Sequence, residues 1–268
     1  MSNTAPVGVF DSGVGGLSVL RELRKQLPHE DLIYFADQAH VPYGPRSMEE
    51  IQSFSKAITQ FLLDQDAKLI VVACNTASAA ALQHLRETFP QIPFVGMEPA
   101  VKPAAEQTAS GVVGVLATPA TFQGRLYASV VERFAQDVTI LKDTCAGLVE
   151  EIEAGRLDGT ETRRILETAL TPMLSAGIDT VVLGCTHYPF VIPLIQEIVG
   201  PDVRVIDPAP AVARQAARLI REGDLGGASD GAGEIRYITS GGRSEFKRLI
   251  SQLLNLDAAV AKFDWEEV

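Results

Sequence analysis

Residues 69–76 read LIVVACNT, and this stretch decides the fold class. Its first five residues are apolar without interruption, which is typical of a strand that helices cover on both faces of a parallel sheet. The alanine-rich sequence that follows predicts a helix directly after Cys74. A buried strand that runs straight into a helix is the repeating unit of α/β proteins.

The same unit recurs along the chain. Short β-branched runs alternate with helical patterns, such as the leucines at 17, 20, 23 and 27, and Ser47 and Glu50 have the spacing of a capping box at a helix start. This alternation predicts βαβ units around mostly parallel sheets. We expect strands at residues 7–10, 32–36, 69–73, 94–97, 111–117, 138–141, 180–184, 203–206 and 235–239.

Matched landmarks indicate an internal repeat. Residues 8–12 correspond to 114–118, Cys74 to Cys185, and Glu98-Pro99 to Asp207-Pro208, all at nearly the same spacing. We therefore expect an α/β fold with two similar doubly wound parallel-sheet domains, related by pseudo-twofold symmetry, and an active site in the cleft between them. The first domain is expected to comprise residues 1–97 plus 208–268, and the second residues 98–207.

Composition excludes several classes of protein. The chain has 268 residues, of which 46% are hydrophobic, and 34 acidic residues outnumber 23 basic ones for a net charge of -11. This acidic balance argues against a nucleic-acid partner. The longest apolar runs fall far short of the roughly 20 residues of a membrane helix, so no membrane association is expected. The first residues lack the pattern of a secretory signal, which favours a cytoplasmic location.

Two of the three cysteines are the candidate reactive groups. Cys74 and Cys185 end predicted strands, where parallel sheets bind ligands, and each is expected to lie immediately before a helix whose amides stabilise a thiolate. A single cysteine of this kind is more often a packed small hydrophobe, but two at matched positions favour a function. Cys145 lacks this setting. The spacing of cysteines and histidines predicts neither a disulfide framework nor a metal site.

Polar residues at the same strand ends indicate a site for a small carboxylate, since hydroxyls, amides and helix N-termini bind such groups. Each residue alone would more often cap a helix, so the set carries the argument. His187 lies two residues after Cys185 and could share its proton. The stretch 11–16 lacks the lysine of a phosphate loop, which disfavours nucleotide binding. The set comprises Asp11, Ser12, Asn75, Thr76, Thr118, Thr121, Thr186 and His187.

Two thiols on opposite sides of a carbon suit racemisation. One thiolate removes the α-proton while the opposite thiol donates another, so no cofactor is needed.

Residues 9–19, 34–37, 41–44, 73–78 and 183–189 together strongly resemble the glutamate racemase family, within the aspartate/glutamate racemase group. The resemblance implies a homodimeric, cofactor-independent enzyme that supplies D-glutamate for peptidoglycan, with Cys74 acting on D-glutamate and Cys185 on L-glutamate. It implies that Asp11, Glu150 and His187 assist proton transfer, although this chain has glycine at 147 where the family commonly has proline. The substrate-binding residues that it implies are Asp11, Ser12, Pro42, Tyr43, Gly44, Asn75, Thr76, Thr118, Thr121, Thr186 and His187.

Three other functions remain open at this point. An aspartate racemase, or one acting on a related amino acid, would differ chiefly in pocket length. A two-lobed amino-acid-binding protein without turnover would not require the cysteines. A hydrolase with a thiol nucleophile would need one dominant cysteine, which the matched pair argues against.

Overall fold

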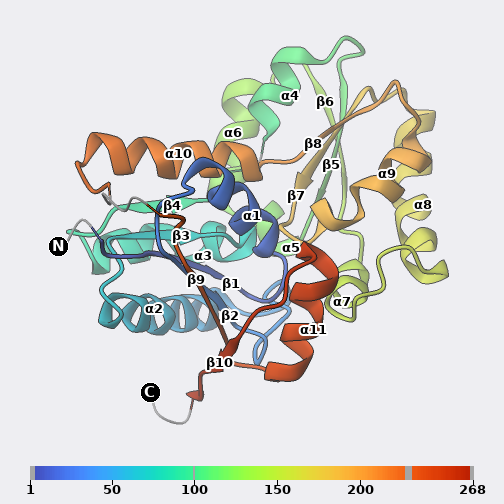
Figure 1. Cartoon of the computed structure of the whole chain (residues 1–268). Helices are drawn as coiled ribbons and strands as arrows, with labels where there is room; N and C mark the ends of the chain where they lie inside the picture. The colour runs from blue at the N-terminus through green and yellow to red at the C-terminus, as the bar shows by residue number, and fades with distance from the viewer. Residues whose placement is uncertain (1–3, 99, 227–230, 266–268) are drawn as a thin grey trace. The chain divides into compact units, whose positions relative to one another are not determined.

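The computed structural model describes residues 4–98, 100–226 and 231–265, and its chain divides into two units. Unit 1 comprises Met1–Met97 and Ala209–Val268, and unit 2 comprises Glu98–Pro208. Each unit is a parallel sheet with helices packed on it, so the predicted fold class of two parallel-sheet α/β domains is confirmed (Figure 1).

The sheet of unit 1 has the strand order β10-β9-β2-β1-β3-β4, and every neighbouring pair is parallel. The C-terminal strands β9 and β10 therefore extend the sheet that the N-terminal strands begin. The strands are β1 (Val7–Asp11), β2 (Leu32–Ala36), β3 (Leu69–Val72), β4 (Phe94–Gly96), β9 (Ile235–Thr239) and β10 (Val260–Lys262).

Helices pack on unit 1 in two groups. Helices α2 (Met48–Asp64) and α3 (Asn75–Thr88) contact one another and bury Phe10, Ile70 and Val72 of the sheet. Helix α1 (Leu17–Gln26) packs against α10 (Ala209–Glu222) and α11 (Arg243–Leu254). All residues of β1, β2 and β3 are buried, as expected for strands between helical layers.

The sheet of unit 2 has the order β6-β5-β7-β8, again with parallel pairs only. This order repeats that of β2-β1-β3-β4, which is the internal repeat that the sequence landmarks indicate. Its strands are β5 (Val112–Ala117), β6 (Thr139–Asp143), β7 (Thr180–Gly184) and β8 (Arg204–Ile206). Its helices are α4 (Val101–Gln107), α5 (Pro119–Gln123), α6 (Arg125–Phe134), α7 (Leu148–Glu153), α8 (Thr160–Ser175), the 3-10 helix η1 (Tyr188–Val191) and α9 (Ile192–Val199).

The expected strands form within a residue or two of their predicted bounds, and the capping box at Ser47 forms with both of its hydrogen bonds. Two short elements, α4 and β10, were not predicted because neither is long enough to show a clear period. The sequence is rich in glycine at residues 223–233, and 227–230 of this stretch lie outside the described residues. Within the described part of the chain, no helix combines the length and apolar character that a membrane span requires.

Candidate active site

Cys74 lies at the carboxyl end of β3 and is the N-cap residue of α3. Its Sγ accepts a hydrogen bond from the Ala77 N–H at 3.4 Å, and its thiol lies 3.8 Å from the Ser12 Oγ. The prediction that a helix follows Cys74 directly is confirmed. The free amides and partial positive charge at a helix N-terminus stabilise a thiolate here.

Asn75, the first residue of α3, supplies the clearest sign of a ligand site. Its side chain is buried, and neither its Oδ1 nor its Nδ2 has a hydrogen-bond partner among the described residues. Leaving such a buried polar group unpaired costs about 1–3 kcal/mol. An unpaired amide next to Cys74 is suited to bind the polar groups of a ligand.

Asp11 and Ser12 lie at the end of β1, the neighbour of β3, so they share a sheet edge with Cys74. The Asp11 side chain is fully buried, and its Oδ1 accepts the Gly13 N–H at 2.8 Å. A Cβ at Gly16 would come within 2.6 Å of the Asp11 Cβ, so only glycine allows this close approach. The turn thereby fixes the direction of the carboxylate.

The loop after β2 carries Pro42, Tyr43 and Gly44. The Tyr43 side chain is buried, and its hydroxyl donates to Asp37 Oδ2 at 2.6 Å. Burial raises the pKa of Tyr43 well above its ordinary value, and the charges of Asp37, Cys74 and Asp11 add to this rise. The hydroxyl therefore remains protonated, and Tyr43 belongs to the same group of side chains as Cys74 and Asp11.

In unit 2, Cys185 begins a chain of three side chains. Its Sγ lies 3.7 Å from His187 Nδ1, and His187 Nε2 lies 2.6 Å from Glu153 Oε1. Burial acts to lower the pKa of His187, but the hydrogen bonds to Cys185 and Glu153 outweigh it and hold that pKa well above 6.5. An imidazolium at this place stabilises a Cys185 thiolate.

The backbone at Cys185 differs from the prediction. A turn over residues 185–187 and the 3-10 helix η1 separate Cys185 from α9, which begins at Ile192. Pro189 and Pro193 account for this, because a proline lacks the N–H that a helix interior needs but suits the first turn of a helix. Each proline therefore lies in the first turn of a new helix, Pro189 in η1 and Pro193 in α9. The thiol of Cys185 is paired with a histidine and does not cap an α-helix.

Glu153, which the sequence analysis did not single out, is the carboxylate on His187. Glu150 lies one turn earlier on α7 and is exposed, whereas the carboxylate that pairs with His187 is that of Glu153. The two glutamates are three residues apart and share a side of α7. The prediction of Glu150 therefore identified the correct helix, but the residue that contacts His187 is Glu153.

The expected threonines of unit 2 lie beside Cys185. Strands β5 and β7 are neighbours, and their ends carry Thr118 and Thr186. Thr118 caps α5 by accepting the Thr121 N–H at 3.3 Å, and the two hydroxyls lie 2.9 Å apart. All three threonines are buried or nearly so. The predicted residues therefore form two groups, one in each unit.

Contrary to the expectation from sequence, Cys145 also follows a strand end, two residues after β6, but its thiol keeps a structural interpretation. It is buried, and burial and the nearby Asp143 raise its pKa far above that of an ordinary thiol. All three cysteines are free. In the described ranges, no group of three or more His, Cys, Asp or Glu side chains could hold a metal ion.

The structure thus has two parallel-sheet units that each carry a thiol and polar side chains at their strand ends, as the internal repeat predicted. Residues 7–216 match the Asp/Glu/Hydantoin racemase family. The chain therefore belongs to this family.

Similar proteins are named glutamate racemases. The chain is 52% identical over 263 residues to the glutamate racemase of Pseudomonas paraeruginosa, covering 98% of this chain and 99% of that one. A crystal structure of glutamate racemase from Francisella tularensis in complex with D-glutamate matches with a TM-score of 0.86 at 30% identity, covering all of both chains. The Escherichia coli enzyme in complex with L-glutamate and the activator UDP-MurNAc-ala matches with a TM-score of 0.84 at 34% identity, covering 97% of this chain and 98% of that one.

Proposed function

We propose that this protein is a glutamate racemase that interconverts L- and D-glutamate with Cys74 and Cys185 as its two acid–base groups. The carrying observation is that both thiols lie at matched strand ends, each beside a group that stabilises a thiolate. The names of the relatives, over nearly the whole chain, support glutamate as the substrate.

In the proposed reaction, the α-proton moves to one thiolate while the other thiol supplies a new proton. With L-glutamate, the Cys185 thiolate removes the proton and the Cys74 thiol donates to the opposite face of the carbanion. With D-glutamate the roles are exchanged. Each turnover leaves the two cysteines with exchanged protonation states, and the next turnover in the other direction, or exchange with water, restores them.

Neighbouring side chains assist each thiol in this proposal. His187, held by Glu153, stabilises the Cys185 thiolate, whereas Ala77 N–H and the N-terminus of α3 stabilise the Cys74 thiolate. Asp11 assists on the Cys74 side. The substrate is held by Ser12, Pro42, Tyr43, Gly44, Asn75 and Thr76 of unit 1 and by Thr118, Thr121, Thr186 and His187 of unit 2.

The decisive experiment is incubation with L-glutamate, without pyridoxal phosphate, followed by chiral chromatography. We expect D-glutamate to accumulate until the two enantiomers are equal. Cys74→Ser and Cys185→Ser should abolish this. Cys145→Ser should retain it, because burial and Asp143 raise the pKa of the Cys145 thiol far above its ordinary value and so disfavour a reactive thiolate. Equal turnover of aspartate would instead indicate the wider substrate range of a related racemase, and activity in both serine variants would contradict the two-thiol mechanism.

The biological role in this proposal is the supply of D-glutamate for peptidoglycan by a cytoplasmic enzyme. The homodimer also remains a prediction, which light scattering of the purified protein would test.

A further inference from the structure

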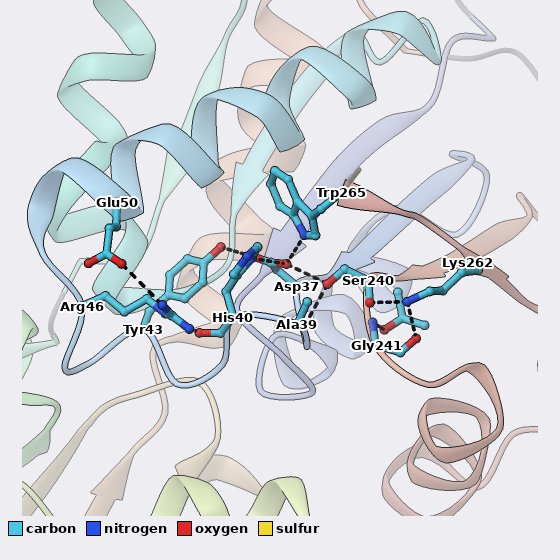
Figure 2. A network of polar contacts seen from close by, with 11 residues as sticks. Asp37, Ala39, His40, Tyr43, Arg46, Glu50, Ser240, Gly241, Lys262 and Trp265 are labelled. Atoms are coloured by element: carbon cyan, nitrogen blue, oxygen red, sulfur yellow. Dashed lines mark hydrogen bonds and ion pairs between the residues drawn. The ribbon is translucent and has the colours of Figure 1, made fainter. Parts of the chain in front are cut away.

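Asp37 is a buried carboxylate that the racemisation chemistry does not use. It follows β2 directly, its side chain is fully buried, and it accepts hydrogen bonds from four groups (Figure 2). The donors are Tyr43 Oη at 2.6 Å, Ser240 Oγ at 2.7 Å, Trp265 Nε1 at 2.9 Å and His40 Nδ1 at 2.9 Å. Hydrogen bonds to an ionised acceptor are about twice as strong as neutral ones.

Two of these donors belong to the loop that carries the proposed substrate contacts Tyr43 and Gly44. His40 closes the loop further, because its N–H donates to Asp37 O at 3.1 Å and its own carbonyl accepts from Arg46 Nε at 2.7 Å. Tyr43 is thus held at its ring by burial and at its hydroxyl by Asp37. Asp37 fixes the direction in which this loop presents its backbone.

The other two donors come from the C-terminal part of the chain, about 200 residues away. Ser240 follows β9 and also accepts the Ala39 N–H at 3.0 Å, while Lys262 of β10 donates to the Ser240 and Gly241 carbonyls. The indole of Trp265 lies edge-on to the His40 ring, with ring centres 4.8 Å apart. His40 in turn stacks on Phe54 of α2 at 3.9 Å. The C-terminal segment therefore supplies part of the contacts that hold the loop containing His40 and Tyr43.

We propose that Asp37 is a positioning residue for racemisation, which holds the Tyr43–Gly44 turn in its binding conformation and makes that conformation depend on the C-terminal segment through Trp265. This inference rests on the proposed function, because it takes the turn to contact glutamate. Loops are commonly mobile, and a binding loop that is ordered before the ligand arrives avoids the entropy cost of ordering it. The network supplies that order without touching the reacting atoms.

The kinetic test compares Asp37→Asn, Tyr43→Phe and Trp265→Phe with Asp257→Asn. Asp257 is an exposed carboxylate in the same C-terminal segment that pairs with Lys247 of α11, outside the network, and serves as the matched control. Losing a charge-assisted hydrogen bond that positions a binding loop should raise KM for both enantiomers about tenfold in Asp37→Asn, with kcat changed less than about threefold. Trp265→Phe keeps an aromatic ring at this position but loses the indole N–H, so its KM should rise about threefold.

If Tyr43 and Trp265 both act through Asp37, their substitutions should not have independent effects on KM. The rise in KM in the double variant Tyr43→Phe/Trp265→Phe should be smaller than the product of the two single effects, because both act through one carboxylate. Thermal unfolding of each variant verifies that it is folded at the assay temperature, and if Asp37→Asn does not fold, the two milder variants provide the same test. An unchanged KM in Asp37→Asn, or effects that multiply in the double variant, would overturn the proposal.

A second readout needs no substrate. Trp265 is the only tryptophan of the chain, so tryptophan emission reports on this network alone. Asp37→Asn should shift the emission to longer wavelengths, because the amide is uncharged and has one accepting oxygen for four donors, so the indole hydrogen bond weakens and the ring becomes more exposed to water. Asp257→Asn should leave the emission unchanged. Emission in Asp37→Asn identical to the parent protein would overturn the link to the C-terminal segment. A parent protein that does not racemise glutamate would instead refute the proposed function and leave this readout intact.

Discussion

Cys74 and Cys185 end corresponding strands of two similar sheets, yet their thiols are stabilised in different ways. Cys74 accepts a backbone N–H at the start of α3, a helix of 14 residues. Cys185 has no such helix and is paired with His187, which is held by Glu153. A helix N-terminus has no proton to lose, whereas an imidazolium has. The repeat therefore conserves the place of the thiol but not the source of its stabilisation.

This difference implies that the two half-sites respond differently to substitution and to pH. Substitutions near Cys185 should alter the titration of His187. Substitutions near Cys74 should alter the backbone dipoles at the start of α3, which do not titrate.

Removing either thiol should have the largest effect. General acid–base groups contribute about 10²–10⁴ in rate, so Cys74→Ala and Cys185→Ala should each reduce racemisation by about a thousandfold or more. In deuterated water, the parent protein should label the product from the first turnover while recovered substrate stays largely unlabelled at early times, as mass spectrometry would show. Early product that retains its α-hydrogen, together with one active alanine variant, would indicate a single base instead.

The second test concerns the carboxylate on His187. Glu153→Gln keeps the shape but removes the charge, and its kcat/KM should fall about tenfold to a hundredfold, because a charge-assisted hydrogen bond contributes about 1.5–3 kcal/mol. The equilibrium constant of a racemisation is unity, so kcat/KM must fall equally in both directions. The asymmetry should appear as a larger primary isotope effect with α-deuterated L-glutamate, whose proton Cys185 removes.

Glu150→Gln is the informative comparison for this test. The Glu150 side chain lies one turn away on α7 and is exposed, so its kcat/KM should fall much less. A larger fall in Glu150→Gln than in Glu153→Gln would return the assisting role to Glu150.

The third prediction is a dependence of stability on pH. The pKa of His187 is raised well above 6.5 in the folded protein, so its contribution to the free energy of unfolding is fully present below about pH 6.5 and is lost as pH rises through the raised pKa. His187→Asn should therefore destabilise the protein most below that pH, and least in alkaline solution. Urea unfolding at several pH values measures this. A constant difference between the variants across pH would show that His187 acts by packing alone.

Ser12→Ala should have the smallest effect. The contact of Ser12 Oγ with the Cys74 thiol is long at 3.8 Å, and the Ala77 N–H remains in place. We expect kcat to fall about twofold to threefold, as for the loss of one weak neutral hydrogen bond. A fall as large as that of Glu153→Gln would mean that Cys74, like Cys185, depends on a side chain.

The sequence predicts local features well and distant ones poorly. The junction at Cys74 was predicted because strand, cap and helix are contiguous in residues 69–88. Glu153 was missed because the choice between two carboxylates depends on how α7 is rotated against His187. The Asp37 network was missed because Ser240 and Trp265 are more than 200 residues away, and no local period indicates such a contact. Short elements with polar neighbours, such as β10, gave no periodic pattern.

The discontinuous sheet of unit 1 has a consequence for biosynthesis. Trp265 follows Asp37 by 228 residues, which at about 5–20 residues per second separates their synthesis by roughly 10 to 45 s. Unit 2, although second in the chain, is the first unit whose segment is synthesised completely. A nascent chain halted shortly before Trp265 would already contain both thiols but not the last anchor of the substrate loop. Ribosome stalling at that point would thus yield chains that hold the reactive groups and bind substrate poorly.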